Sequence, residues 1–476
     1  MPPRRRTGVG LLSPLMSRST ADVAASQSGR RERWWAPPLA VLLVAGAVAG
    51  TAVVGKRLAE SGVVLHLLGG YVLRGLPDVV LDRRALLPLV LGLAGVAWGP
   101  ALAARARWWV LLCGSAGAAA GWAVALAVTS GGWETSGGWE RLTEPLSSVY
   151  EYPYDVGRVE SVGTLLETFN QFVPADSADP WTTHVSGHPP GALLAFVFLD
   201  RLGLGGLGWA AAMCVLGGAL AVPAVLVTVR AIAGEGTARV VAPFAVLAPT
   251  ALWVATSADA LFAGVAAWGV ALLAVAAARN RGRGADAAAV AGGLVLGLAL
   301  FLSFGLTSLG LLALGVVLVH LHRLGRSGVV RVLALAAGGV LAVAAVFALA
   351  GYWWLEGLSV AADRVRSGPS YADRPLSFFL VANLAAAAIA AGPAAVAGLG
   401  ALRRVRLALV PAAVLVGMVV SDLTGLVRGE TERIWLPFTV WLPVAAAFLP
   451  ERQRRWWLAA SVVVAVAVEE GIRTEW

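Results

Sequence analysis

The sequence predicts an all-α, polytopic membrane protein with about 12–13 transmembrane helices. Its 476 residues are 58% hydrophobic and only 14% charged, whereas a soluble domain carries about 25% charged residues. The mean hydropathy is +0.76. Apolar runs of roughly 17 to 25 residues, the length that crosses about 30 Å of hydrocarbon as a helix, alternate with short charged clusters. These runs lack the period-two alternation of a membrane barrel strand, so we expect helices.

Each apolar run marks one candidate span. The predicted spans are 35–54, 86–102, 108–129, 207–229, 239–255, 259–278, 287–303, 306–321, 330–351, 377–400, 407–421, 434–450 and 456–469. Residues 59–80 are apolar too, but they include His66, Arg74 and Asp78. For them we expect an interfacial helix rather than a span, because charged groups are costly at the bilayer centre.

The arginines predict the orientation of these spans. The short basic connections are 105–107, 230–239, 279–283, 323–326, 403–406 and 452–455, whereas 55–85, 130–206, 352–376 and 422–433 hold most of the acids. The positive-inside rule places such short basic loops in the cytoplasm, together with the polar N-terminal segment. Segment 55–85, with Lys56, Arg57, Arg83 and Arg84, is the one that fits an outer position badly. The sequence thus predicts a multi-pass plasma-membrane protein with four parts: a disordered cytoplasmic tail (1–33), N-terminal transmembrane helices (34–129), an extracytoplasmic loop (130–206) and a transmembrane helix bundle (207–470).

The net charge of +9 does not indicate a nucleic-acid partner. The basic residues stand in short clusters between apolar runs, where membrane topology accounts for them, and the expected partner is the lipid bilayer. The two cysteines, Cys113 and Cys214, fall inside apolar segments and are interpreted as core residues rather than a disulfide or metal site.

Residues 130–206 hold the most informative motifs. The segment opens with the Gly/Trp-rich sequence GGWETSGGWE and reaches the acids Glu151 and Asp155 in YEYPYD. Residues 159–169 have apolar side chains at helical spacing, which predicts an amphipathic helix along the membrane surface. The sequence HVSGHPPG follows at 184–191, before a short apolar run and a full span.

This order of motifs resembles the polyprenyl-phosphate-sugar-dependent glycosyltransferases of the GT-C fold, such as the protein O-mannosyltransferases and the lipid A aminoarabinose transferases. Residues 248–259 resemble the outer-facing turn of that family, and GGLVLGLALFLSFG at 292–305 resembles its Gly-rich helix pair, although a lysine often found after the serine is absent. The resemblance covers residues 130–325. Two or three spans before the acidic loop depart from the usual single one.

The resemblance implies a GT-C-like fold with a polyprenyl-phosphate sugar donor and a cell-envelope glycan or protein acceptor. Such a reaction needs a carboxylate to take the proton of the acceptor hydroxyl. Asp155 is the first candidate for this base and Glu151 the second; Asp259, near membrane depth, is the third. Each acid has a plainer interpretation, as an exposed loop acid or, for Asp259, a helix cap. No soluble phosphate-binding loop motif is present, which fits a lipid-linked donor.

The leaving phosphate needs cationic or hydrogen-bonding partners. His188, with Pro189 and Pro190, could contact it, or the prolines could simply form a rigid turn. His184 could pair with His188 at a metal, but two histidines are weak evidence. We therefore expect no cofactor and leave a divalent metal open.

A second group of phosphate candidates follows at the last outer loop. Arg433 lies there with Glu430 and Glu432, and a guanidinium offers a planar fork of donors to a phosphate. The alternative is a salt-bridged helix cap. Arg374, in the 352–376 loop, is a further phosphate candidate.

A transporter or lipid-linked-sugar flippase without catalysis is the rival hypothesis. A transporter is expected to show internal repeats with broken helices in corresponding positions. The sequence shows no such self-similarity, and its one long polar loop lies in the first half. The sequence therefore favours the enzyme.

Overall fold

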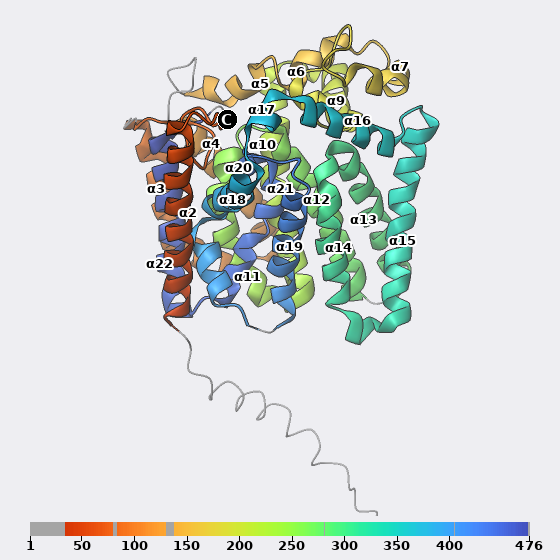
Figure 1. Cartoon of the computed structure of the whole chain (residues 1–476). Helices are drawn as coiled ribbons and strands as arrows, with labels where there is room; N and C mark the ends of the chain where they lie inside the picture. The colour runs from red at the N-terminus through yellow and green to blue at the C-terminus, as the bar shows by residue number, and fades with distance from the viewer. Residues whose placement is uncertain (1–33, 80–82, 130–137, 280, 404, 475–476) are drawn as a thin grey trace, which may run out of the picture.

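The computed structural model describes residues 34–79, 83–129, 138–279, 281–403 and 405–474. The predicted tail 1–33 and most of the Gly/Trp-rich segment, 130–137, lie outside the described residues. Long helices stand side by side in one bundle, and the short helices of residues 138–206 cover one end of it (Figure 1).

Within the described residues, nine helices are long and apolar enough to cross a membrane. They are α2 (Ala36–Glu60), α3 (Leu86–Arg105) with the preceding turn from Arg83, α4 (Trp108–Ala127), α10 (Leu207–Ala233), α12 (Ala258–Arg279), α13 (Arg283–Leu302), α15 (Leu321–Leu349), α18 (Leu376–Gly400) and α19 (Leu409–Leu423) with the preceding turn from Arg406. The prediction of an all-α, multi-pass membrane protein is confirmed.

The remaining four predicted spans are also helical, but they are broken into short pieces or carry charges at both ends. They correspond to α11 (Glu235–Val246) with the 3₁₀ turn η6 (Pro249–Trp253), η7 (Phe304–Leu309) with α14 (Gly310–Leu318), α21 (Leu436–Thr439) with η9 (Leu442–Phe448), and α22 (Glu451–Gly471). That these four also cross the bilayer stays a prediction.

The end of the bundle that carries residues 138–206 is called the loop end. Its short helices are α5 (Glu144–Ser147), α6 (Tyr152–Asp155), α7 (Val162–Thr168), α8 (Thr183–Ser186), α9 (Pro190–Leu199), α16 (Trp354–Ser367), α17 (Pro369–Asp373) and α20 (Thr431–Ile434).

The chain also has shorter helical turns at either end of the bundle. They are η1 (Arg83–Ala85), η2 (Trp139–Leu142), η3 (Val156–Arg158), η4 (Phe169–Phe172), η5 (Asp200–Leu204) and η8 (Arg406–Ala408).

The amphipathic helix predicted at 159–169 is present as α7, which continues into η4. Ser161 caps its first turn, since the Ser161 hydroxyl accepts from the Thr164 amide. Leu165, Leu166 and Phe169 are buried in the main hydrophobic core. The apolar face of this helix therefore packs against the protein, with α9 and α16 as neighbours.

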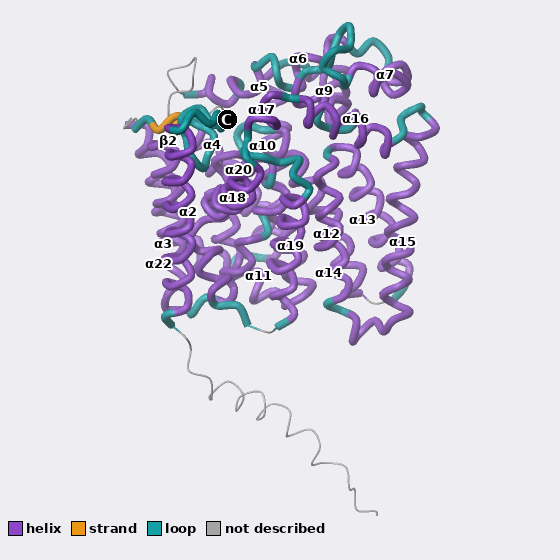
Figure 2. Tube along the Cα trace, viewed as in Figure 1, coloured by secondary structure: helices purple, strands orange, loops and turns teal. Residues whose placement is uncertain are grey.

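The prediction of an interfacial helix at 59–80 is wrong. Helix α2 runs on to Glu60, and the chain then forms turns up to the two-residue strand β1 (Leu76–Pro77). This strand pairs antiparallel with β2 (Ile472–Arg473), which follows α22 (Figure 2). The physical reason is that this segment's polar groups bind elsewhere in the protein. The backbone carbonyls of Leu65 and His66 accept hydrogen bonds from Arg374. In an interfacial helix these carbonyls would instead accept from backbone N–H groups of the same helix.

Glycines set how closely the central helices approach. A Cβ on Gly264 of α12 would lie 2.0 Å from the carbonyl oxygen of Gly217 on α10, and one on Gly293 of α13 would lie 2.0 Å from that of Ala336 on α15. Small residues permit this contact, and van der Waals packing drives helix association where lipid removes the hydrophobic force.

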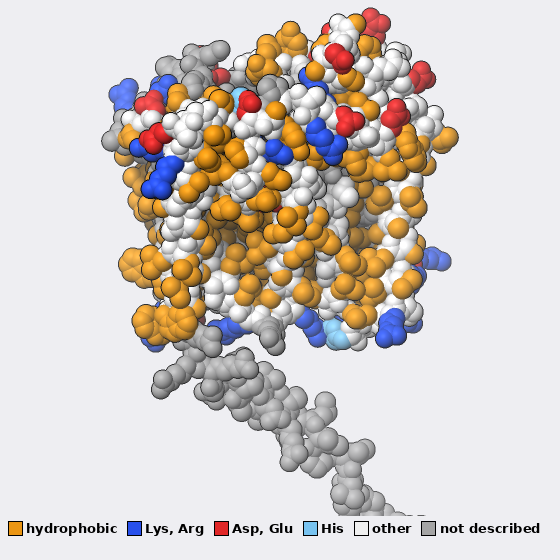
Figure 3. All heavy atoms as spheres, viewed as in Figure 1, with side chains coloured by type: hydrophobic (Ala, Val, Ile, Leu, Met, Phe, Trp, Pro, Cys, Tyr) orange, Lys and Arg blue, Asp and Glu red, His pale blue; other side chains and the backbone are white. Residues whose placement is uncertain are grey.

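The end opposite the loop end, where α2 and α22 begin, is called the arginine end. In the view of Figure 3, hydrophobic side chains cover the sides of the bundle, acidic side chains gather at the loop end, and basic side chains lie at both ends. This distribution matches a protein whose sides contact lipid.

Candidate functional site

Five ionisable side chains from four separate segments meet at the loop end, and we call this group the Arg433 cluster. Its members are Glu151, His184, Asp259, Glu430 and Arg433. Glu151 precedes α6, His184 lies in α8, Asp259 lies in the first turn of α12, and Arg433 lies in α20. Buried ionisable groups brought together from separate segments are functional candidates.

Arg433 is the centre of the cluster. Its Nη1 donates to Asp259 Oδ2 at 2.7 Å, and its Nη2 lies 3.4 Å from both Glu430 Oε2 and His184 Nε2. Arg433 and Asp259 are each only 4% exposed. Burial acts to lower the pKa of Arg433, but the carboxylates of Asp259, Glu151 and Glu430 raise it above its ordinary value, so the guanidinium stays charged.

Glu151 is the acid of the cluster that contacts His184. Its Oε1 lies 2.9 Å from His184 Nδ1, while its buried Oε2 has no hydrogen-bond partner in the described part of the chain. Burial acts to raise the pKa of Glu151, but His184 and Arg433 hold it below its ordinary value. The lowered pKa favours the ionised form of Glu151, which can accept a proton at its unpartnered oxygen, although that oxygen is itself buried.

His188 lies beside the cluster and is held by two contacts. Its Nδ1 is 2.8 Å from the backbone oxygen of His184 and 2.9 Å from the Tyr152 hydroxyl. Because a carbonyl oxygen only accepts, Nδ1 must carry the proton. Burial lowers the pKa of His188, which keeps the ring neutral. This ring fixes the turn that presents His184.

Pro189 and Pro190 form the start of α9. Pro190 occupies the first helical position, where the absent N–H costs no hydrogen bond, and both prolines are buried. A Cβ on the next residue, Gly191, would lie 2.4 Å from the Phe301 carbonyl oxygen, so α9 approaches α13 closely here. These contacts account for the two prolines as a rigid turn, and a contact with substrate stays a prediction.

Glu430 and Glu432 bind a residue that the sequence analysis did not select, Arg74. Its Nη1 lies 2.9 Å from Glu430 Oε1, and its backbone N–H donates to Glu432 Oε1 at 2.9 Å. Glu430 has a left-handed backbone, with φ of 60°. An arginine inside an otherwise apolar segment was the available signal for Arg74.

The pKa values of the two glutamates are shifted in opposite directions. Burial raises the pKa of Glu432 to about 7, and the nearby Glu430 charge adds to this. Burial acts in the same sense on Glu430, but Arg74, Arg433 and Arg374 together lower its pKa to about 2. Among described residues, the second oxygen of Glu432, Oε2, is buried without a hydrogen-bond partner.

Asp155 does not belong to the Arg433 cluster. Its side chain is fully buried, one oxygen lies 2.7 Å from Arg158 Nη1, and the other accepts from the Thr182 amide at 2.9 Å. Arg158 also stacks on Trp181 at 4.2 Å. These contacts tie the two halves of the loop together. A catalytic role for Asp155 stays a prediction, and its geometry favours it less than Glu151.

Arg374 is likewise held mainly by backbone groups. Its guanidinium donates to the carbonyl oxygens of Leu65 (2.9 Å), His66 (2.8 Å) and Arg428, and lies 3.5 Å from Glu430. Burial lowers the pKa of Arg374. Arg374 therefore joins three loops, and a contact with phosphate stays a prediction.

Within the residues that the structure describes, no three His, Cys, Asp or Glu side chains are grouped so as to hold a metal ion. Two hollows of about 590 and 470 Å³ lie at the arginine end, between residues of α10, α11, η9 and α22. The most exposed members of the cluster are His184 and Glu430, whose side chains are 16% and 15% exposed, and the side chain of Arg74 beside Glu430 is 23% exposed.

Comparison of the chain with known protein families, curated proteins and solved structures finds no match. The class of the protein, a multi-pass helical membrane protein, therefore rests on its apolar helices. Its activity is inferred from the cluster itself.

Proposed function

We propose that the chain is a membrane glycosyltransferase that moves a sugar from a polyprenyl-phosphate donor to a cell-envelope glycan or protein outside the cytoplasm. The observation that carries the proposal is the Arg433 cluster, in which a buried ionised carboxylate with one unpartnered oxygen lies close to a charged guanidinium. The motif order that resembles the GT-C glycosyltransferases supports the same assignment, with the loop end facing outwards.

The proposed reaction has one base and one phosphate partner. The acceptor hydroxyl oxygen attacks the anomeric carbon, and its proton passes to Glu151 Oε2. The bond between that carbon and the phosphate oxygen breaks, and the polyprenyl phosphate leaves with the electron pair and an additional negative charge. Arg433 stabilises this charge, as a preorganised cation does where charge develops. The lipid tail of the donor stays in the bilayer beside the bundle.

Glu151 suits the role of base better than the other acids. Asp259 is bound to Arg433 at 2.7 Å and orients that guanidinium, while both Asp155 oxygens have partners. His184 positions Glu151 by its 2.9 Å contact with Oε1. In the proposed reaction, Glu151 Oε2 is the oxygen that takes the proton of the acceptor hydroxyl.

In the proposed reaction, the donor phosphate binds Arg433 in place of its weak contact with Glu430. Arg433 Nη2 lies 3.4 Å from Glu430, longer than the roughly 2.7–2.9 Å of a strong charge-assisted bond. A phosphate oxygen can replace Glu430 there, because Glu430 keeps its 2.9 Å partner Arg74. The bond between Arg433 and Asp259 would remain intact.

The test compares Glu151→Gln with Asp155→Asn in membranes supplied with radiolabelled polyprenyl-phosphate mannose or a polyprenyl-phosphate pentose. Glu151→Gln keeps the size of the side chain and removes the proton acceptor, so turnover is expected to fall by roughly 10²- to 10⁴-fold while donor binding survives. Asp155→Asn is expected to retain turnover and lower stability.

The reverse pattern would return the role of base to Asp155. If the wild-type chain transfers neither sugar but carries the lipid-linked sugar across the bilayer, the flippase is the correct function. Equal transfer by wild type and by a variant with Glu151, Asp155 and Asp259 all neutralised would end the transferase proposal.

A further inference from the structure

The smaller hollow at the arginine end is lined by both basic and apolar side chains. It has a volume of about 470 Å³ and lies where α3, α11 and α22 meet. Its lining includes the charged residues Arg239, Arg454, Arg455 and Glu451 and the apolar residues Pro243 and Phe244. With three arginines against one glutamate, the lining has an excess of positive charge.

The arginines of this lining differ in how far they are already bonded. Arg239 is committed, since its Nη1 donates to the carbonyl oxygens of Ala103 (2.6 Å) and Ala106 (2.8 Å) and its Nη2 lies 2.6 Å from Glu235. Arg454 donates only through Nε, to Leu449 at 3.3 Å, and Arg455 only through Nη2, to Ala97 at 3.3 Å. Within the described residues, the other nitrogens of Arg454 and Arg455 make no hydrogen bond.

The surroundings of the hollow are those of a lipid boundary. Trp456 of α22 and Trp98 of α3 are 78% and 65% exposed, and tryptophans gather at the level of the lipid headgroups. Leu102, on the same helix as Trp98, also has an exposed side chain. Arginines with unused donors thus lie at headgroup level beside an apolar helix surface.

We propose that this hollow binds the headgroup of an anionic phospholipid. Its phosphate accepts hydrogen bonds from Arg454 and Arg455, while its acyl chains lie against the exposed apolar side of α3. Basic pockets between transmembrane helices recognise such headgroups, because the guanidinium supplies both charge and donors near the membrane surface.

The charge near the hollow favours a lipid over an acidic segment of the same chain. The Gln453 amide donates to the Trp34 carbonyl oxygen at 2.9 Å, so the chain enters α2 beside the start of α22. The sequence before Trp34 carries Arg30, Arg31 and Arg33. The segment that precedes α2 is thus basic in sequence rather than acidic, which favours an anionic lipid as the occupant.

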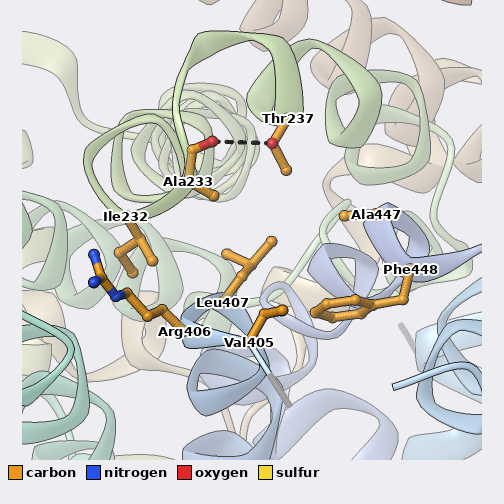
Figure 4. A pocket seen from close by; sticks show the side chains of 8 residues that line it. All are labelled: Ile232, Ala233, Thr237, Val405, Arg406, Leu407, Ala447 and Phe448. Atoms are coloured by element: carbon orange, nitrogen blue, oxygen red, sulfur yellow. Dashed lines mark hydrogen bonds between the residues drawn. The ribbon is translucent and has the colours of Figure 1, made fainter. Parts of the chain in front are cut away.

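The second hollow at this end does not share these features. It has a volume of about 590 Å³ and is lined by Ile232, Thr237, Val405, Arg406, Leu407 and Phe448 (Figure 4). In this view its single guanidinium, that of Arg406, lies at the edge near Ile232. It therefore lacks the paired donors on which the proposal rests.

The experiment measures lipid binding to the full chain purified in detergent and stripped of lipid. Dioleoyl phosphatidylglycerol, dioleoyl phosphatidylcholine and inorganic phosphate are added separately, and binding is followed by native mass spectrometry and by the thermal unfolding midpoint. The anionic lipid is expected to bind and to raise the midpoint. Phosphatidylcholine and inorganic phosphate are expected to do neither.

Three variants test the location. Arg454→Gln with Arg455→Gln is expected to weaken phosphatidylglycerol binding about tenfold or more. Arg452→Gln removes a neighbouring charge that does not line the hollow, and is expected to bind as wild type does. Ala104→Phe fills the hollow from an exposed position without changing charge, and is expected to lose binding even if the double variant fails to fold.

Four results would overturn the proposal. They are equal binding of the two lipids, equal loss in Arg452→Gln, full binding by Ala104→Phe, and a midpoint shift produced by inorganic phosphate alone. The last result would assign the hollow to a free anion. None of these outcomes bears on transfer at the loop end, so the test is independent of the proposed function.

Discussion

Arginines stand at both ends of the bundle, but they are bonded in different ways. At the loop end, the guanidinium of Arg433 is buried against the carboxylates of Asp259 and Glu430. At the arginine end, Arg454 and Arg455 are more accessible and each donates to a single backbone carbonyl. The same residue type is therefore part of a closed ionic network at one end and has donors to spare at the other.

The difference follows from solvation. A guanidinium that remains near water or lipid headgroups needs no protein partner, because the solvent satisfies it. Once buried, it costs several kcal/mol unless a carboxylate offsets the lost hydration. At the loop end, the packing of α6, α8, α12 and α20 buries Arg433. The same packing brings its carboxylate partners into contact, so the lost hydration of the guanidinium is offset.

The largest expected effect is the loss of Arg433. Arg433→Gln leaves Asp259 and Glu430 without their common cation, and breaking a buried ion pair in this way typically costs about 3–5 kcal/mol. Arg455→Gln, the matched change at the arginine end, is expected to cost less than about 0.5 kcal/mol. The free energy of unfolding, measured by SDS titration in mixed micelles, compares the two. Similar values for both would show that burial does not distinguish the two ends.

A smaller effect is expected from the pH dependence of Glu432. Its pKa is about 7 in the folded chain against an ordinary value of 4.5. The folded state therefore binds the proton more tightly, and this stabilisation is complete below pH 4.5 and is lost as the pH rises through 7. The expected loss between pH 5 and 8 is roughly 2–3 kcal/mol.

Glu430 affects the free energy of unfolding in a different pH range from Glu432. Its pKa is about 2, so its stabilisation is present above pH 4.5 and is lost only as the pH falls towards 2. Glu432→Gln should flatten the profile between pH 5 and 8, whereas Glu60→Gln, at an exposed position, should leave it unchanged. An unaltered profile in Glu432→Gln would assign the titration to another group.

The smallest effect is expected at Lys56. Its ammonium lies 3.8 Å from Glu60, and the two side chains are 60% and 63% exposed. Solvent screens such a pair, so Lys56→Ala should change the free energy of unfolding by at most about 0.5 kcal/mol. A loss above about 1 kcal/mol would mean that α2 depends on this surface pair.

The spans were predictable because each one is a local property. The helices α10, α12 and α18 occupy the apolar runs that the sequence marked, and α7 occupies the amphipathic run. Residues 59–80 were predicted wrongly because their backbone groups bind Arg374 and their side chain Arg74 binds Glu430, partners far away in the chain. No local sequence pattern predicts a contact between residues so far apart in the chain.

The choice among the acids shows the same division. The sequence indicated Asp155 and Glu151 by their position in the long polar loop and Asp259 by its position at a turn between two apolar segments, and it ranked Asp155 first. Contacts then placed Asp259 and Glu151 around Arg433 and left Asp155 with Arg158. His184 was weighed only as a metal ligand, since nothing in its sequence neighbourhood shows that it lies 2.9 Å from Glu151.

By itself the sequence determined that lipid is the solvent of this protein, which segments are helices and which end carries the long loop. These properties depend on composition and spacing, because hydrocarbon requires every span to satisfy its own backbone hydrogen bonds. Only the tertiary structure decided which charged side chains meet. Ion pairs such as Arg433 with Asp259 join residues on different helices, and their geometry depends on how small residues let those helices approach.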